Sequence, residues 1–225
     1  MSKISLKHTG GNVVSLNAPT NAPGAADVAF KLPNADGSAG QFMKTDGSGN
    51  LSFAAAGGGG KILQVFQDTK TDVQSFTISS SSEYGTILGT VSGLSQAITL
   101  SDASHQVLVQ GFISLGSSYS GDTSISVSLE RDNAQITGAI GDAAGSRRRN
   151  MFTAHLAASA RGPVPFPFSF LDTPGTVGPH TYSIEISHQY AATGTYYVNR
   201  GNESTDNIYN TRGISVITVM EYDPT

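Results

Sequence analysis

The chain has no cysteine and no tryptophan among its 225 residues. Without cysteine there are no disulfides and no thiolate metal ligands, so stability has to come from packing and association. No apolar run approaches the ~20 residues that cross a membrane, and residues 1–8 lack the apolar core of a signal peptide. We therefore expect a protein that is made in the cytoplasm and does not insert into a membrane.

Charge is scarce as well. Only 13% of the residues are charged, and the formal net charge is −4, with all of the acidic excess beyond residue 60. A protein that binds the phosphate backbone of nucleic acid needs a dense basic face. The sequence therefore predicts no nucleic-acid partner.

Catalytic and cofactor signatures are also missing. No serine has glycine both two before and two after it, and there is no His-Glu-x-x-His, P-loop or Gly-x-Gly-x-x-Gly motif. The turns at residues 36–40 and 46–50 lack the closing Glu of a calcium loop. The histidines show no ligand spacing. The five histidines without such spacing are His8, His105, His155, His180 and His188. We therefore expect that the protein is not an enzyme and has no cofactor and no metal site.

The first quarter of the chain contains two Asp-Gly pairs, Asp36-Gly37 and Asp46-Gly47, each flanked by short apolar segments. Asp-Gly favours the positive φ values of tight hairpin turns. Such short segments cannot close a core alone, but they become stable when several copies wind around a common axis. We therefore predict a short intertwined β shaft over residues 25–53.

Residues 1–24 form a separate segment, with a few apolar positions followed by a break at Pro19 and Pro23. We expect a docking arm that binds another protein of the same particle; the alternative is a disordered terminus. The docking residues would be Ile4, Leu6, Val13 and Leu16.

Residues 54–60 read Ala-Ala-Ala-Gly-Gly-Gly-Gly, which predicts a flexible linker and a domain boundary. Beyond it, β-rich runs alternate with turn clusters over residues 61–225, which predicts an all-β, jelly-roll-like sandwich knob. Twelve runs exceed the eight strands of a plain jelly roll, so some should be edge pieces or loops. The runs are 61–67, 73–78, 86–91, 97–100, 106–115, 123–131, 135–140, 150–157, 166–171, 181–190, 195–199 and 213–222.

The last run has apolar residues on both faces, with Val216 and Met220 on one face and Ile217 and Val219 on the other. In a two-layer sandwich, an outward apolar face usually marks an association surface. We predict a homotrimer that associates through this strand, with Ile217 and Val219 at the interface. The alternative is a strand covered by a loop of its own subunit.

Two groups of residues are candidate receptor contacts. Guanidinium groups bind anionic glycans bidentately, and tyrosines beside Gly, Ser and Asn suit recognition of carbohydrate or protein. The alternatives are arginines paired with nearby carboxylates and tyrosines that are ordinary sheet residues. The candidates are Arg147, Arg148, Arg149, Tyr196, Tyr197 and Tyr209.

Several segments resemble small fibre-like structural proteins of tailed bacteriophages, particularly of marine hosts. They are ADVAFKLPNADGSAGQFMKTDGSGNLSF, FLDTPGTVGPHTYSIEI, residues 196–200 and the terminal RGISVITVMEY. The resemblance implies a trimeric virion component with a β-rich tip. It does not distinguish tail from head.

We therefore expect a tail fibre or spike that is located in the virion and whose trimeric knob binds a host surface glycan or protein. A head fibre or capsid decoration protein is the main alternative, because the arm is short. A glycan depolymerase is a third hypothesis, against which the lack of a carboxylate motif counts.

Overall fold

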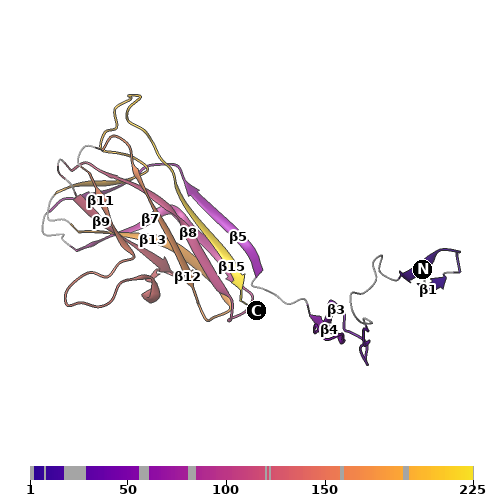
Figure 1. Ribbon diagram of the computed structural model, residues 1–225. Coiled ribbons are helices and arrows are strands. Elements are labelled where there is room, and N and C mark those ends of the chain that lie inside the picture. The colour runs from indigo at the N-terminus through magenta and orange to yellow at the C-terminus, as the bar shows by residue number, and fades with distance from the viewer. Residues whose placement is uncertain are drawn as a thin grey trace. The chain divides into compact units, whose positions relative to one another are not determined.

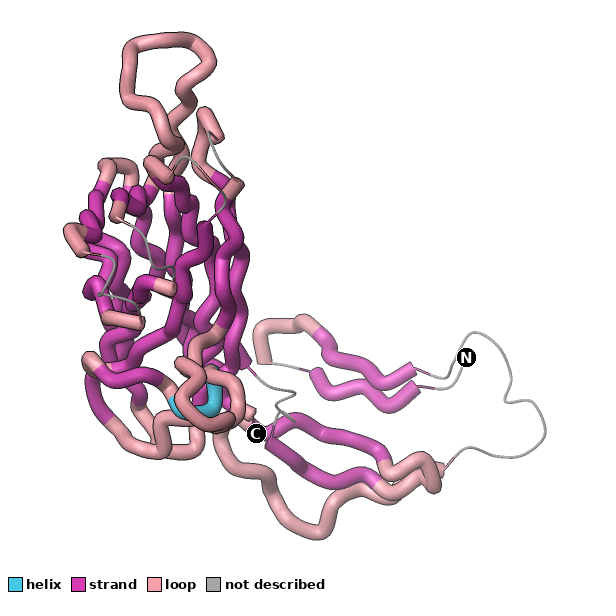
Figure 2. Tube along the Cα trace, turned by 90° about the vertical axis from the view of Figure 1, so that its left-hand side faces the viewer, coloured by secondary structure: helices cyan, strands magenta, loops and turns pink. Residues whose placement is uncertain are grey.

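The computed structural model describes residues 3–7, 9–17, 29–55, 61–80, 85–119, 121, 123–157, 160–189 and 193–224. The chain divides into two compact units, residues 1–57 and residues 58–225 (Figure 1). Nearly all regular structure is β-strand; among the described residues, the short 3₁₀ turn Thr137–Ala139 is the single helical element (Figure 2). The predicted all-β class is confirmed.

The second unit, which we call the knob, contains two antiparallel sheets. Sheet I has the order β11-β9-β13-β7, with the short β10 beside β9. Sheet II has the order β5-β15-β8-β12, and β14 and β6 continue it beyond the start of β15. The strands are β5 (Lys61–Lys70), β6 (Gln74–Ile78), β7 (Ile87–Leu100), β8 (Gln106–Ser117), β9 (Thr123–Arg131), β10 (Ala134–Gln135), β11 (Phe152–Leu156), β12 (Val164–Asp172), β13 (Gly178–His188), β14 (Gly194–Val198) and β15 (Ser215–Asp223).

Eight of these strands are nested like one long hairpin folded over itself. The first pairs with the last (β5 with β15), the second with the seventh (β7 with β13), the third with the sixth (β8 with β12) and the fourth with the fifth (β9 with β11). This pairing, divided between two packed sheets, is the jelly roll. The predicted jelly-roll-like sandwich is confirmed, and β6, β10 and β14 are the additional pieces.

The core follows from period-two alternation. On β9, Ile125, Val127 and Leu129 are fully buried between the sheets, and they alternate with serines on the outer face. Ile184 and Ile186 of β13 pack beside them. Non-directional apolar burial of this kind is the main term that holds the two sheets together.

Two strand edges are protected against pairing with other chains. The outer edge of β12 carries Pro165 and Pro167, which lack the N–H group that an added strand would need. The edge of β7 is bonded by side chains instead. Gln64 donates to the carbonyl of Thr99, and Gln74 accepts from the amide of Ser92.

The strand predictions differ from the structure in two places. Residues 87–91 and 97–100 belong to one long strand, β7, which follows β13 through a bulge where Gly93 takes a left-handed φ of +65°. Residues 135–140 are mostly the 3₁₀ turn rather than a strand.

The prediction that Ile217 and Val219 of the last strand lie at a subunit interface is wrong. Ile217 and Val219 of β15 have 0% exposure and lie in the core, opposite Gly111 and Val109 of β8. A buried core side chain is not available to a neighbouring subunit. Because strand faces alternate, the outward residues are instead Val216, Thr218 and Met220.

The described part of the first unit contains two β-hairpins with little buried surface. In one, β1 (Lys3–Lys7) pairs with β2 (Val13–Asn17); in the other, β3 (Gln41–Thr45) pairs with β4 (Leu51–Ala55). The linker expected over residues 54–60 therefore begins inside a strand. Large apolar side chains of this unit stay exposed, namely Ile4, Leu6, Val13, Phe30, Leu32, Phe42 and Met43.

The two Asp-Gly pairs behave differently. Asp46 closes the β3–β4 turn by accepting from the amides of Ser48 (2.8 Å) and Asn50 (3.2 Å), with Gly47 at φ +80°. Gly37, however, is not in the left-handed region, and a Cβ there would meet the ring of Phe53 at 2.7 Å. The absence of a side chain at Gly37 therefore allows close packing against Phe53. The prediction of a tight hairpin turn at Asp36-Gly37 is wrong.

A titratable cluster lies at the end of the knob where β5 begins and β15 ends. His105 Nδ1 lies 2.6 Å from Glu221 Oε1, and Gln64 also donates to Glu221. The hydrogen bond to Glu221 raises the pKa of His105 above its ordinary value. Burial raises the pKa of Glu221, but the hydrogen bonds from His105 and Gln64 outweigh this and hold it below the ordinary range.

This cluster should make knob stability pH-dependent. Because the folded-state pKa of His105 is raised, its contribution is complete below the unfolded pKa of about 6.5 and is lost as the pH rises through the folded value. Urea unfolding above pH 6.5 should show a falling midpoint, and His105→Gln should flatten that fall. His155→Gln, at an exposed histidine of β11, is the control. An unchanged pH slope in His105→Gln would contradict this role.

Candidate binding surface on the distal loop

The structure places the two predicted receptor patches on different sheets. Arg147, Arg148 and Arg149 belong to the loop before β11, which bonds to the outer face of sheet I. Tyr209 belongs to the segment between β14 and β15 of sheet II. We call residues 199–213 the distal loop, which projects beyond the sheets (Figure 1, yellow, top). The two patches therefore do not form one site.

The arginine cluster is largely used within its own chain. Arg148 donates to the carbonyl of Gly85 (3.0 Å) and to the buried carboxylate of Glu185 (3.1 Å). Arg149 donates through Nε to the carbonyl of Gly141 (2.6 Å). This is the alternative in which the cluster pairs with groups of its own subunit. Arg147 alone of the three is exposed.

Two of the three candidate tyrosines are structural. Tyr196 is 1% exposed; its hydroxyl donates to the carbonyl of Ser124 and bonds to Thr123. Tyr197 is buried beneath the guanidinium of Arg200, 4.0 Å from the ring centroid. Both predictions of receptor contact are wrong, because alternation within β14 and the stacked arginine remove both rings from the surface.

The base of the distal loop is fixed by Asn199, which is fully buried and has a left-handed φ of +64°. Its Nδ2 donates to the carbonyls of Lys70 (2.9 Å) and Asp72 (3.0 Å), and its Oδ1 accepts from Ser215 (2.7 Å). Buried hydrogen bonds of this kind rigidify a segment because leaving one unmade is costly. The loop is therefore held where it leaves sheet II.

Backbone contact adds to this base. Gly201 lies so close to the chain before β12 that a Cβ would meet the carbonyl oxygen of Arg161 at 2.4 Å. The amide of Asn202 donates to the carbonyl of Ala160 (2.8 Å). The same Arg161 places its guanidinium 5.4 Å from the ring centroid of Tyr209. The exposed ring therefore lies beside a cationic side chain whose backbone packs against the base of the loop.

The tip of the loop is a polar cup beside exposed apolar groups. Asn210 donates to Thr205, and Asn207 accepts from the amide of Tyr209 (3.0 Å). Ile208 is 88% exposed and Tyr209 is 64% exposed. The cup encloses about 260 Å³ and is lined by Ser204, Thr205, Asp206, Asn207, Asn210 and Arg212.

Hydroxyl, amide, carboxylate and guanidinium groups beside an exposed ring can form hydrogen bonds to sugar hydroxyls while the ring packs on a sugar face. Sequence reasoning selected Tyr209 as a candidate contact but did not select Arg212, Asp206 and Asn207, which line the adjacent cup. A usable signal was present, since these residues lie in a long, polar, Asn-rich stretch between two predicted strands.

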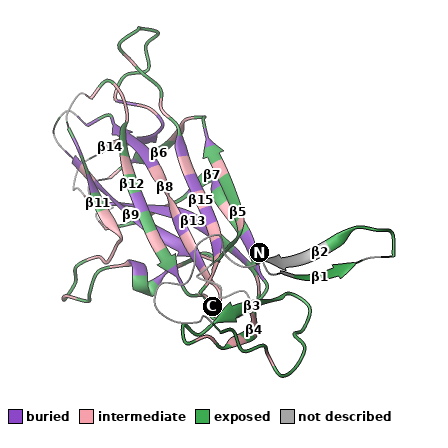
Figure 3. Ribbon diagram, turned by 45° about the vertical axis from the view of Figure 1, so that its right-hand side comes forward, coloured by how far each residue is buried: buried purple, intermediate pink, exposed green. Residues whose placement is uncertain are grey.

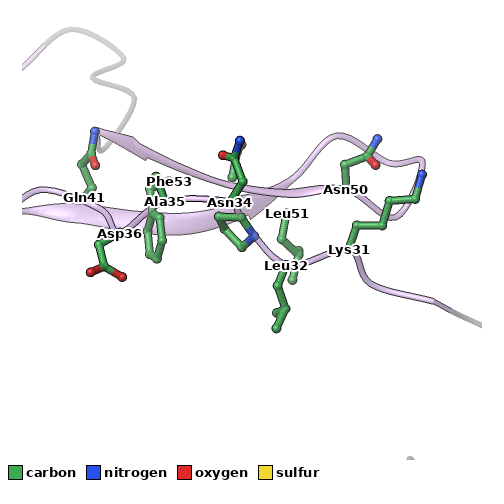
Figure 4. Close-up of a pocket in the computed structure, with 11 residues that line it drawn as sticks. Lys31, Leu32, Asn34, Ala35, Asp36, Gln41, Asn50, Leu51 and Phe53 are labelled. Carbon is green, nitrogen blue, oxygen red and sulfur yellow. The ribbon is translucent and has the colours of Figure 1, made fainter.

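A second, larger hollow of about 520 Å³ lies on the first unit, along the β3–β4 hairpin and the chain before it. In Figure 4, Lys31, Leu32 and Asn34 are spread along the hairpin instead of converging on one point. Lys31 exchanges backbone hydrogen bonds with Gly49 and Leu51 (both 2.8 Å). The hollow is thus the open side of a small sheet and presents no catalytic grouping.

Among the described residues, no three or more His, Asp or Glu side chains are grouped to hold a metal ion. Within the same ranges, no helix is long and apolar enough to cross a membrane. Of the predicted docking residues, Ile4, Leu6 and Val13 are exposed, while the side chain of Leu16 lies outside the described part.

Comparison with known proteins gives distant structural matches. No protein-family model matches the chain, and no curated protein matches it either. Solved structures with some likeness include the infectious bursal disease virus Gx strain (15% identity, TM-score 0.36, covering 94% of this chain and 46% of that one). The VP2 subviral particle of the same virus is another, with 14% identity, a TM-score of 0.35, and coverage of 93% and 46%. This chain thus spans less than half of either.

Asn199 generates a stability prediction. Asn199→Ala removes three buried side-chain hydrogen bonds, so we expect a loss of about 1–3 kcal/mol in the free energy of unfolding, together with faster proteolysis inside the distal loop. Asn202→Ala, at a half-exposed position of the same loop, should change neither. Equal urea midpoints for the two variants would show that Asn199 does not anchor the loop.

Proposed function

We propose that this protein is a homotrimeric virion component, a tail fibre or spike, that binds the host cell surface through the distal loop. The observation that carries the proposal is the exposed Tyr209 beside a polar cup on a loop whose base is rigidly bonded. A recognition group held by a fixed scaffold loses little conformational entropy on binding. The ligand class that fits the cup best is a surface glycan.

The first unit supports a role within an assembly. Its two hairpins leave Phe30, Leu32, Phe42 and Met43 exposed, and an isolated two-stranded hairpin is at best marginally stable. These side chains would be covered if three copies of residues 25–53 wound together. Residues 1–24, with Ile4 and Leu6 exposed, would then attach the trimer to another virion protein.

A head fibre or decoration protein without a receptor is the main alternative, and the short attachment segment favours it. A depolymerase is the third. The alternatives differ in what happens to host polysaccharide: a decoration protein leaves it unbound, a receptor-binding protein binds it intact, and a depolymerase releases new reducing ends.

Receptor binding can be tested with the full-length protein, labelled and applied to host cells and to arrayed bacterial surface polysaccharides. Tyr209→Ala should weaken binding about tenfold or more, as expected for a central aromatic contact, with little dependence on salt. Arg212→Ser should weaken binding more at low salt, because charge attraction is screened at higher ionic strength.

Arg147→Ser is the matched control, because this exposed arginine belongs to the loop on sheet I, whereas the distal loop belongs to sheet II. If Arg147→Ser abolishes binding and Tyr209→Ala does not, the receptor surface is on sheet I. If the wild-type protein binds neither cells nor any polysaccharide, a role as a decoration protein becomes the better assignment than a role in receptor binding.

The docking arm makes a separate prediction. Deleting residues 1–24 should leave the knob folded, because the knob core contains none of the described residues of the first unit. The truncated protein should fail to join the particle. We would measure its incorporation into virions by immunoblotting, with circular dichroism as the check on folding. Normal incorporation would exclude a docking role for these residues.

A further inference from the structure

The outer face of sheet II is uncharged across four strands. The register aligns its outward residues in rows across β5, β15, β8 and β12. One row is apolar throughout, the next is polar but neutral, and the third is mixed. The rows are Val65, Met220, Leu108 and Leu171; Gln67, Thr218, Gln110 and Ser169; and Thr69, Val216, Phe112 and Pro167.

The apolar end of this face is hollowed. Ile62 and Tyr222 extend the apolar row, and with Leu108, Leu171 and Met220 they line a groove of about 390 Å³. Ile62 is 61% exposed and Val65 is 52% exposed, so β5 appears largely exposed at the edge of the sheet (Figure 3). Contiguous exposed apolar surface on a sheet marks an interaction site.

The opposite face of the sandwich is different. On sheet I, the outward residues Ser126, Ser128 and Glu185 are polar and buried. They accept hydrogen bonds from Asn150, Gln135 and Arg148 of the same chain, respectively. One outer face therefore carries polar groups bonded from within the chain, while the other is uncharged, with an apolar end that stays exposed in the single chain. The asymmetry indicates that something outside the chain covers sheet II.

We infer that the outer face of sheet II, together with β5, is the surface on which a second copy of this chain docks. This inference rests on the homotrimer of the proposed function and names the face that forms it. Around a threefold axis, the residues nearest the axis approach the equivalent residues of the other copies, so a charge there would meet its like. A face built from neutral rows avoids this repulsion.

The position of the face along the chain supports the same occupant. Its apolar end lies where β5 starts, at Lys61, which pairs with Asp223 at the end of β15. Residues 29–55 precede this point and also expose large apolar side chains. If copies associate through that segment, the chain continuity brings the start of β5 in each copy near the others.

Sedimentation of the full-length protein tests the inference. Wild type should sediment as a species of several times 23.3 kDa. Leu171→Glu and Val65→Glu should each shift it toward the monomer, because a carboxylate would be desolvated in the interface. Ile208→Glu, which adds the same charge at an exposed apolar residue of the distal loop, should leave the assembly unchanged.

The outcomes separate the inference from the proposed function. A wild-type oligomer that survives both glutamate variants overturns the face assignment but keeps the oligomer. A wild-type monomer overturns both the face and the homotrimer, while glycan binding by the distal loop is still read from the array. Dissociation caused equally by Ile208→Glu would also overturn the face assignment.

A second measurement guards against misfolding of the glutamate variants. The chain has no cysteine, so Gln110→Cys introduces a single thiol in the neutral row of the face. Mild oxidation, or a short bis-maleimide, should cross-link Gln110→Cys between copies and leave Ser204→Cys of the distal loop uncross-linked. Cross-linking of Ser204→Cys without Gln110→Cys would place the contact on the loops and reject the sheet.

Discussion

The pairing of the first knob strand with the last is the constraint on which the rest of the structure depends. Because β5 lies beside β15, the remaining six strands nest inside, and the loops separate to two ends of the sandwich. One end holds Lys61, Asp223 and the bond between His105 and Glu221. The distal loop leaves from the other end of β15. The start of the knob and the loop that we propose for recognition thus lie at opposite ends of β15.

This arrangement supports the proposal that recognition lies in one loop. The distal loop interrupts the pairing of β8, whose edge is taken by β15 at one end and by β14 at the other. The chain leaves the sheet at Asn199 and returns at Ser215, and these two residues are hydrogen-bonded to each other. A long excursion with joined ends can present exposed groups without loosening the core.

Much of the fold could be predicted from the sequence, because alternation such as Ser-Ile-Ser-Val-Ser-Leu in β9 determines both a strand and its buried face. The face of β15 could not, since Val216 and Ile217 are equally apolar and only the register against β8 decides which one is inside. Tyr196 was misassigned for a similar reason. Nothing in composition shows that its hydroxyl meets Ser124, which is 72 residues away in the chain.

The place of β15 in sheet II also affects how the protein is made. It is the last of the eight nested strands to be synthesised, yet it lies between β5 and β8. Until it emerges from the ribosome, β5 and β8 are separate edges with no neighbour between them, and their apolar side chains face water. Folding of the knob is therefore completed after synthesis of nearly all of it, through contacts distant in sequence, which are slow to form and expose the nascent chain to aggregation.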